Sequence, residues 1–122
     1  MSVNTLMSGS SICGLKPGDQ LTLDQALYGL MLCSGNDAAN VLAEYYSGSI
    51  DKFAEEMNRE AKALGATQSH FVNANGLPDD DHYTTIYDMY LIFQAAIQTQ
   101  DLLISYIPKV MMPLIRMYPV MP

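Results

Sequence analysis

Apolar side chains recur at helical spacing in four separate stretches of the chain. The stretches cover residues 23–31, 38–45, 50–64 and 86–97. Because residues three or four positions apart lie on one face of an α-helix, each stretch predicts an amphipathic helix. The tripeptide Ser34-Gly35-Asn36 interrupts the pattern between the first two stretches. The pattern therefore predicts a mainly helical body, and no internal repeat is visible in it.

Residues typical of helix ends stand at the borders of these stretches. Thr22 is followed three residues later by Gln25, a capping-box pattern in which each side chain binds a backbone N–H at the helix start. Ser49 is a natural N-cap for the third helix, and Thr85 is one for the fourth. Gly65 stands where a left-handed C-cap glycine is expected. The helix borders are thus predicted from local sequence alone.

Short β pieces are expected only outside the four helices. Residues 16–19, Lys-Pro-Gly-Asp, indicate a tight turn, and the runs 11–15 and 20–23 on either side of it could form a small hairpin. The loop over residues 66–83 holds one further candidate strand at 69–72.

The last fifteen residues differ from the rest of the chain. They hold four of the six prolines and four of the nine methionines, and their apolar residues show no periodicity. Proline at this density prevents a regular helix. We therefore expect a body over residues 1–107 and a separate Pro/Met-rich tail over residues 108–122.

Composition narrows the class of protein. With 122 residues, 49% hydrophobic and 16% charged, the chain suits one compact globular domain. Its formal charge of -7 and only six scattered basic residues argue against nucleic acid as a partner, because phosphate binding needs clustered Lys and Arg. No stretch reaches the roughly 18 apolar residues needed to span a bilayer, and the N-terminus lacks a signal-peptide pattern.

No metal site or cofactor is expected from the sequence. Cys13 and Cys33 make neither a disulfide framework nor a metal-binding pattern. They could pair with each other, but the simpler interpretation is that both are small buried residues. His70 and His82 lack zinc-ligand spacing. Residues 79–81, Asp-Asp-Asp, lack the alternating spacing of a calcium loop. We expect His82 to be hydrogen-bonded near the start of the fourth helix.

Ser34-Gly35-Asn36 is the candidate site for chemistry. A break between two helices can direct two short polar side chains at one spot, with Gly35 free to adopt unusual backbone angles. Alone, the tripeptide is equally an ordinary helix end followed by an Asn cap.

Longer motifs around this tripeptide change the interpretation. They comprise residues 15–22 (LKPGDQLT), 27–39 (LYGLMLCSGNDAA), 57–58, 61–62, 64–67 (LGAT), 70–77 (HFVNANGL), 82–85 (HYTT) and 87–89. In this order and spacing, over roughly residues 8 to 104, the chain resembles the penicillin-binding serine D-alanyl-D-alanine carboxypeptidases of bacterial cell walls, as a fragment of them.

The resemblance implies a fold, a reaction and a site. The chain would be the helical subdomain of an α/β fold of the DD-peptidase and serine β-lactamase type. The parent enzyme would remove the terminal D-alanine from a peptidoglycan pentapeptide through a serine acyl-enzyme, without metal or cofactor, outside the cytoplasmic membrane, and would react with β-lactams. Ser34 and Asn36 would belong to its Ser-x-Asn motif. There, Ser34 would relay a proton to or from the leaving group, and Asn36 would bind the substrate backbone and help position the catalytic lysine.

Departures from the family pattern predict that this chain is inactive alone. No Ser-x-x-Lys precedes Ser34, and no Lys-Thr-Gly occurs. Residues 49–52 fit the Ser-x-x-Lys spelling but follow Ser34, where a helix start is expected, so Ser49 is interpreted as an N-cap and the chain as lacking a nucleophile. The alternative is a non-catalytic helical module that binds a wall peptide or a partner chain. Apolar helix faces without a covering sheet also predict self-association.

Overall fold

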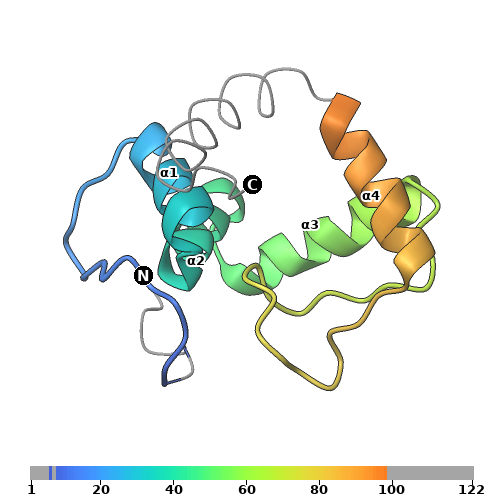
Figure 1. The fold of residues 1–122 in the computed structure, drawn as a ribbon, viewed down its shortest axis with the longest axis horizontal. Helices are drawn as coiled ribbons and strands as arrows, with labels where there is room; N and C mark the ends of the chain where they lie inside the picture. The colour runs from blue at the N-terminus through green and yellow to red at the C-terminus, as the bar shows by residue number, and fades with distance from the viewer. Residues whose placement is uncertain (1–5, 7, 99–122) are drawn as a thin grey trace, which may run out of the picture.

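The computed structural model describes residue 6 and residues 8–98, which form four α-helices joined by short turns and one long loop. The helices are α1 (Leu23–Cys33), α2 (Asn36–Ser47), α3 (Ile50–Ala63) and α4 (Ile86–Gln98). Helix α2 packs on both α1 and α3. Helix α3 leads away from the α1–α2 pair, and α4 lies at its far end (Figure 1). The N-terminal segment passes beside the α1–α2 pair, so residues far apart in sequence meet there (Figure 1).

The predicted helix starts are confirmed in detail. The Thr22 hydroxyl accepts from the Gln25 N–H at 3.2 Å, and the Gln25 side chain accepts from the Thr22 N–H at 2.9 Å. Ser49 accepts from the Lys52 N–H at 3.2 Å and so caps α3. Thr85 accepts from the Asp88 N–H at 3.1 Å at the start of α4. Each contact satisfies a donor that has no partner within the helix.

Two polar side chains fix the loop between α3 and α4. Asn58 of α3 binds both backbone groups of Phe71: its Oδ1 accepts from the N–H and its Nδ2 donates to the carbonyl, each at 2.7 Å. The Asp88 carboxylate, which is buried, accepts from the Gln68 N–H and the Ser69 hydroxyl, each at 2.7 Å. The loop is therefore held at one point by α3 and at another by α4.

The β content is smaller than expected. Within the described residues the structure has one isolated antiparallel bridge, between His70 and Tyr83, and no named strand. The turn at residues 16–19 forms, with the Asp19 N–H donating to the Lys16 carbonyl at 3.1 Å. The hairpin expected around it does not form, because the N–H groups of residues 13–15 bind the Asp37 side chain instead of a second strand.

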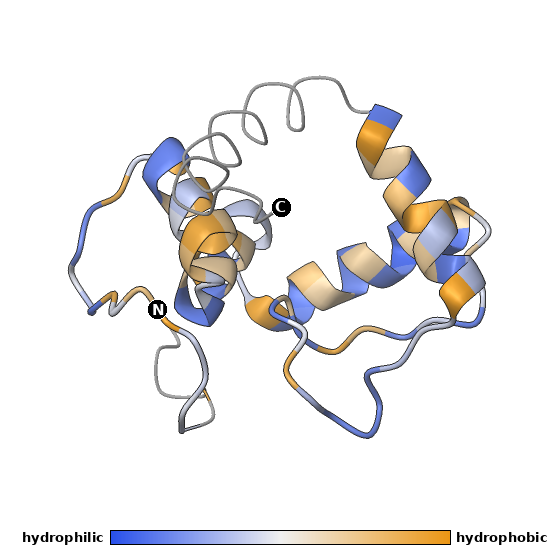
Figure 2. Ribbon diagram, in the orientation of Figure 1, coloured by the Kyte–Doolittle hydropathy of each residue, from blue (hydrophilic) through white to orange (hydrophobic). Residues whose placement is uncertain are grey.

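The apolar core of the described residues consists of small side chains. Its members are Ala26, Ala38, Ala39, Ala43, Ala54, Ala61 and Ala66. Large apolar side chains stay exposed instead, and Ile86 at the start of α4 is 93% exposed. Hydrophobic residues occur along the length of α4 (Figure 2). An apolar surface of this kind is typical of helices whose packing partner is not part of the described chain.

The remaining expectations concern the chain ends and the membrane. The boundary between residues 107 and 108, and the tail beyond it, lie outside the described residues. Within the described part, no helix has both the length and the apolar character needed to cross a bilayer.

Candidate functional site

The corner between α1 and α2 presents Ser34 to solvent. Ser34 has a left-handed backbone, with φ of 48° and ψ of 41°, and ends α1. The N–H groups of Ser34 and Gly35 both donate to the Gly29 carbonyl. This conformation is uncommon for a residue with a Cβ and requires support from its surroundings. The hydroxyl that the sequence singles out is thus held on a sharp, exposed corner.

Asn36, the first residue of α2, is bound by the N-terminal segment. Its backbone N–H and its side-chain Nδ2 both donate to the Ser11 carbonyl oxygen, at 3.0 and 2.9 Å. Since a carbonyl oxygen can only accept, the Asn36 amide is oriented with its nitrogen towards Ser11. The Ser11 hydroxyl in turn donates to the Cys33 carbonyl at 2.5 Å. Ser11 therefore binds both helices at the corner.

Asp37 is the buried charge that fixes the segment over the corner. Its side chain is 1% exposed, and its two oxygens accept from four backbone N–H groups at 2.9 Å. Three of the donors are consecutive, Cys13, Gly14 and Leu15, and the fourth is Ala38. Gly14 has a φ of 83°, which lets successive N–H groups converge on one anion.

The pKa of Asp37 reflects this arrangement. Burial acts to raise the pKa of the carboxyl, but the hydrogen bonds from Cys13, Leu15, Ala38 and Gly14 outweigh it, so the pKa lies below its usual value. The ionised form is further suited to the first turn of α2, where the helix dipole favours negative charge. Asp37 is thus a structural anion that positions its neighbour Asn36.

Cys13 fills the space beside Gly35 that a larger residue would need. A Cβ built on Gly35 would overlap the Cys13 Sγ, and one built on Gly29 would lie 2.9 Å from it. Burial, together with the nearby Asp37 charge and Cys33, raises the pKa of the Cys13 thiol to about 11. The prediction of two buried cysteines is wrong: Cys13 is half-buried and Cys33 is exposed.

Ser49 lies apart from this corner. Ser34 precedes α2 and Ser49 follows it, so the 12-residue helix separates them by about 18 Å. Ser49 also uses its hydroxyl as the cap of α3. Both observations support the interpretation of Ser49 as a structural residue.

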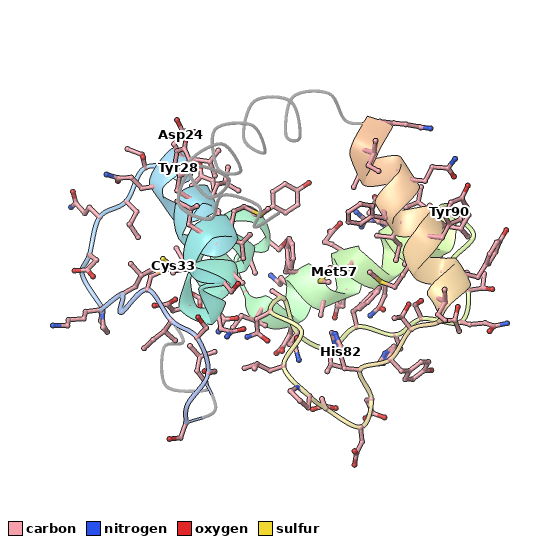
Figure 3. All side chains as sticks on the ribbon, viewed as in Figure 1. Asp24, Tyr28, Cys33, Met57, His82 and Tyr90 are labelled. Carbon is pink, nitrogen blue, oxygen red and sulfur yellow. The ribbon has the colours of Figure 1, made fainter. Side chains whose placement is uncertain are left out.

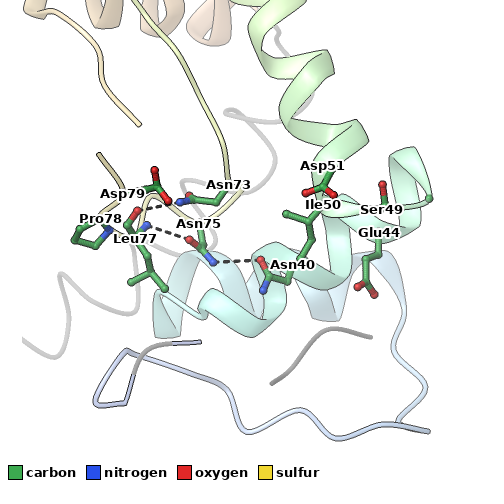
Figure 4. A pocket seen from close by; sticks show the side chains of 11 residues that line it. Asn40, Glu44, Ser49, Ile50, Asp51, Asn73, Asn75, Leu77, Pro78 and Asp79 are labelled. Atoms are coloured by element: carbon green, nitrogen blue, oxygen red, sulfur yellow. Dashed lines mark hydrogen bonds between the residues drawn. The ribbon is translucent and has the colours of Figure 1, made fainter. Parts of the chain in front are cut away.

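The loop beyond α3 forms a polar pocket of about 680 Å³ with α2 and the start of α3. Asn75 of the loop donates to Asn40 Oδ1 of α2 at 3.2 Å across it (Figure 4). Glu44, Asp51 and Asp79 also line the pocket. No group of three or more His, Cys, Asp or Glu side chains within the described residues is arranged to hold a metal ion.

The two histidines have structural contacts within this loop. His82 Nδ1 accepts from the Val72 N–H at 3.1 Å, and the His82 ring packs edge-on against Phe71 with centroids 5.4 Å apart. His82 is therefore hydrogen-bonded within the loop that leads to α4, where the bridge between His70 and Tyr83 brings the two sides of the loop together. His70 Nδ1 lies 2.6 Å from the Asp81 carbonyl oxygen.

Comparison with known proteins identifies the family. The sequence profile of the D-alanyl-D-alanine carboxypeptidases matches residues 1–113. The chain belongs to this family. The resemblance inferred from the motifs around Ser34-Gly35-Asn36 is thereby confirmed.

Individual relatives agree with the profile. The chain is 38% identical over 96 residues to D-alanyl-D-alanine carboxypeptidase DacF of Bacillus subtilis, covering 79% of this chain and 24% of the relative. It is 42% identical over 95 residues to DacA of Escherichia coli, covering 78% and 24%. The chain therefore spans about a quarter of the length of these curated relatives.

Solved structures confirm the fold class. Penicillin binding protein 6B from Escherichia coli matches with a TM-score of 0.73 at 34% identity, covering 79% of this chain and 30% of that one. The D-alanyl-D-alanine carboxypeptidase DacD from Francisella tularensis matches with a TM-score of 0.70 at 38% identity, covering 75% and 22%. The four helices thus form a mainly helical part of the DD-carboxypeptidase fold.

Sequence reasoning missed Asp37 as the organising residue of the corner. The only local signal is an acidic residue in the first turn of a helix, which is common and says nothing about partners more than 20 residues away.

Proposed function

We propose that this chain is the helical part of a serine-type D-Ala-D-Ala carboxypeptidase that trims peptidoglycan pentapeptides, and that it is inactive by itself. The observation that carries the proposal is the placement of Ser34 and Asn36 at the α1–α2 corner of a fold shared with solved DD-carboxypeptidases. The relatives named as carboxypeptidases favour this proposal over a non-catalytic binding module.

Ser34 has the exposure that a proton relay requires. Its side chain is exposed at the corner, so a substrate can reach the hydroxyl. A hydroxyl that both donates and accepts can pass a proton between an activated nucleophile and a departing amine. In this proposal Ser34 returns the proton to the leaving D-alanine.

Asn36 has the fixed orientation that substrate binding requires. Because its Nδ2 donates to the Ser11 carbonyl, the amide plane and the direction of its oxygen are set before substrate arrives. In this proposal Asn36 hydrogen-bonds the backbone of the wall peptide and helps to position a lysine that this chain does not supply.

The missing reaction step is formation of the acyl-enzyme. A Ser-x-x-Lys motif occurs only at Ser49, which caps α3 about one helix length away from Ser34. Without a nucleophile beside the relay there is no covalent intermediate. The chain would then act at the cell envelope, on peptidoglycan stem peptides and β-lactams, only as part of a complete catalytic unit.

Intact mass after incubation with a reactive penicillin tests the proposal, together with an assay for D-alanine release from a pentapeptide. We expect no added mass and no released D-alanine, while penicillin binding protein 6B from Escherichia coli, as a positive control, should bind the penicillin. Stoichiometric acylation of this chain would contradict inactivity. Matched Ser34→Ala and Ser49→Ala variants would then show which hydroxyl reacted.

A further inference from the structure

The two cysteines of the chain lie together at the α1–α2 corner, although 20 positions separate them in sequence. Cys13 Sγ packs against Gly29 and Gly35, in the space that a Cβ on either residue would occupy. Gly29 is one helical turn before Cys33, so the two residues share one face of α1. Cys13 therefore lies over the face of α1 that carries Cys33.

The general direction of helical side chains favours an approach of the Cys33 side chain to the turn of Gly29. A helical side chain points back towards the N-terminus and covers the preceding turn, which for Cys33 is the turn of Gly29. The Cys13 thiol interacts with the side chains of both Asp37 and Cys33, consistent with this direction. Cys33 lies on the side of the helix pair that faces the N-terminal segment (Figure 3).

Hydrogen bonds hold the two segments in this register. The Ser11 hydroxyl donates to the Cys33 carbonyl, and the Asn36 N–H donates to the Ser11 carbonyl. Cys13 is itself bound through its N–H to Asp37. These hydrogen bonds therefore keep the segment that carries Cys13 beside the end of α1 that carries Cys33.

We propose that Cys13 and Cys33 form an intrachain disulfide under oxidising conditions, and that this bond locks the N-terminal segment onto the α1–α2 corner. The bond would join the N-terminal segment to the end of α1, beside the contacts that this segment makes with Asn36 and Asp37. The same segment supplies the carbonyl that orients Asn36. Oxidation would therefore rigidify the candidate site and protect the exposed thiol next to Ser34.

The reaction proceeds by thiol–disulfide exchange with a small disulfide such as oxidised glutathione. The exposed Cys33 loses its proton and attacks one sulfur of glutathione disulfide, which forms a mixed disulfide and releases one reduced glutathione. Cys13 then loses its proton and attacks the Cys33 sulfur, and the second glutathione leaves. The two protein thiols are oxidised, and one glutathione disulfide is reduced to two thiols. The raised pKa of Cys13 makes the second step faster as pH rises.

Equilibration of the chain in glutathione redox buffers, followed by acid quenching, alkylation and intact mass, tests the proposal. We expect a monomeric product about 2 Da lighter than the reduced chain, with two thiols blocked from alkylation. Peptide mapping should place the bond between Cys13 and Cys33. The equilibrium constant for forming the Cys13–Cys33 disulfide from glutathione disulfide should be at least about tenfold higher in native buffer than in concentrated urea. The reason is that folding raises the effective concentration of one thiol at the other.

Serine variants provide matched controls. Cys13→Ser should leave Cys33 carrying glutathione, and Cys33→Ser should leave Cys13 largely reduced, because Cys13 is half-buried. Three results with the unmodified chain would overturn the proposal: a stable glutathione adduct on Cys33, disulfide-linked dimers as the main product, or an equilibrium constant no higher in native buffer than in urea.

Discussion

The side-chain amide of Asn36 and the carbonyl oxygen of Ser11 lie 2.9 Å apart, and this contact joins the candidate site to the N-terminal segment. Ser11 precedes Asn36 by 25 positions, so the contact exists only in the folded chain. The buried Asp37 beside it binds the same segment through three further N–H groups. The geometry of the Ser-Gly-Asn corner therefore depends on residues 11–15 as much as on the helices that carry it.

The anchoring role of Asp37 predicts a large loss of stability in Asp37→Asn. The amide keeps one acceptor oxygen but places an NH₂ group against backbone donors, so we expect a loss of about 2–3 kcal/mol. Urea unfolding followed by circular dichroism measures it. Asp80→Asn, in an exposed loop, is the matched control and should change stability by less than about 0.5 kcal/mol. Equal effects of the two substitutions would contradict the anchoring role.

The same residue predicts a stability that falls in acid. Since the pKa of Asp37 is lower in the folded chain than in the unfolded chain, its contribution is present above the unfolded value, about 3.9, and is lost as pH falls through the folded value. Unfolding free energies measured from pH 6 down to about pH 2 should show this slope. Asp37→Asn should flatten it, and an unchanged slope in that variant would assign the acid sensitivity to other carboxylates.

Cys13 predicts a second loss of stability, at alkaline pH. Its pKa is raised from 9.0 to about 11 in the folded chain, first by burial and then by the Asp37 charge. The contribution of the protonated Cys13 thiol to the free energy of unfolding is therefore complete below pH 9, and it is lost as pH rises towards 11. Reduced chain and a Cys13→Ser variant, compared by thermal unfolding between these pH values, should differ in slope. Parallel curves would show that the thiol is not protected from ionisation.

The contact between Gly35 and Cys13 predicts a steric coupling. Gly35→Ala places a methyl group where the Cys13 Sγ lies, and we expect a loss of about 1–3 kcal/mol. In the Cys13→Ala background, the loss of stability caused by Gly35→Ala should be smaller by at least about 0.5 kcal/mol. A double-mutant cycle measures this difference. The rescue will be partial, because the added Cβ also approaches Asp37 Oδ1 at 3.0 Å and the Gly29 carbonyl at 3.1 Å. Strict additivity of the two substitutions would contradict the contact.

The exposed face of α4 predicts self-association of the isolated chain. Ile86, Tyr90, Phe93 and Ile97 recur at helical spacing and are each more than half exposed. Sedimentation velocity should show species larger than a monomer, and Phe93→Glu together with Ile97→Lys should shift the population towards monomer. Glu55→Lys, an exposed position on α3, is the control and should leave the distribution unchanged. A monomeric unmodified chain at high concentration would refute the prediction.

The sequence by itself determined the features that depend on neighbouring residues. The Thr22–Gln25 capping box, the Ser49 cap and the left-handed Gly65 were predicted correctly, because their interactions close within a few positions of the chain. The family was also recognisable from its motifs, because their order and spacing can be read directly from the sequence.

Only the tertiary structure decided which distant groups meet. The expected hairpin over residues 11–23 failed because the N–H groups of residues 13–15 have a better acceptor in the buried carboxylate of Asp37, 22–24 positions away. The proximity of Cys13 to Cys33 and the binding of Phe71 by Asn58 likewise have no local signal. A charged acceptor that is buried away from water must be hydrogen-bonded by the donors that the fold brings to it. For Asp37, three of these donors are distant in sequence, so local sequence does not identify them.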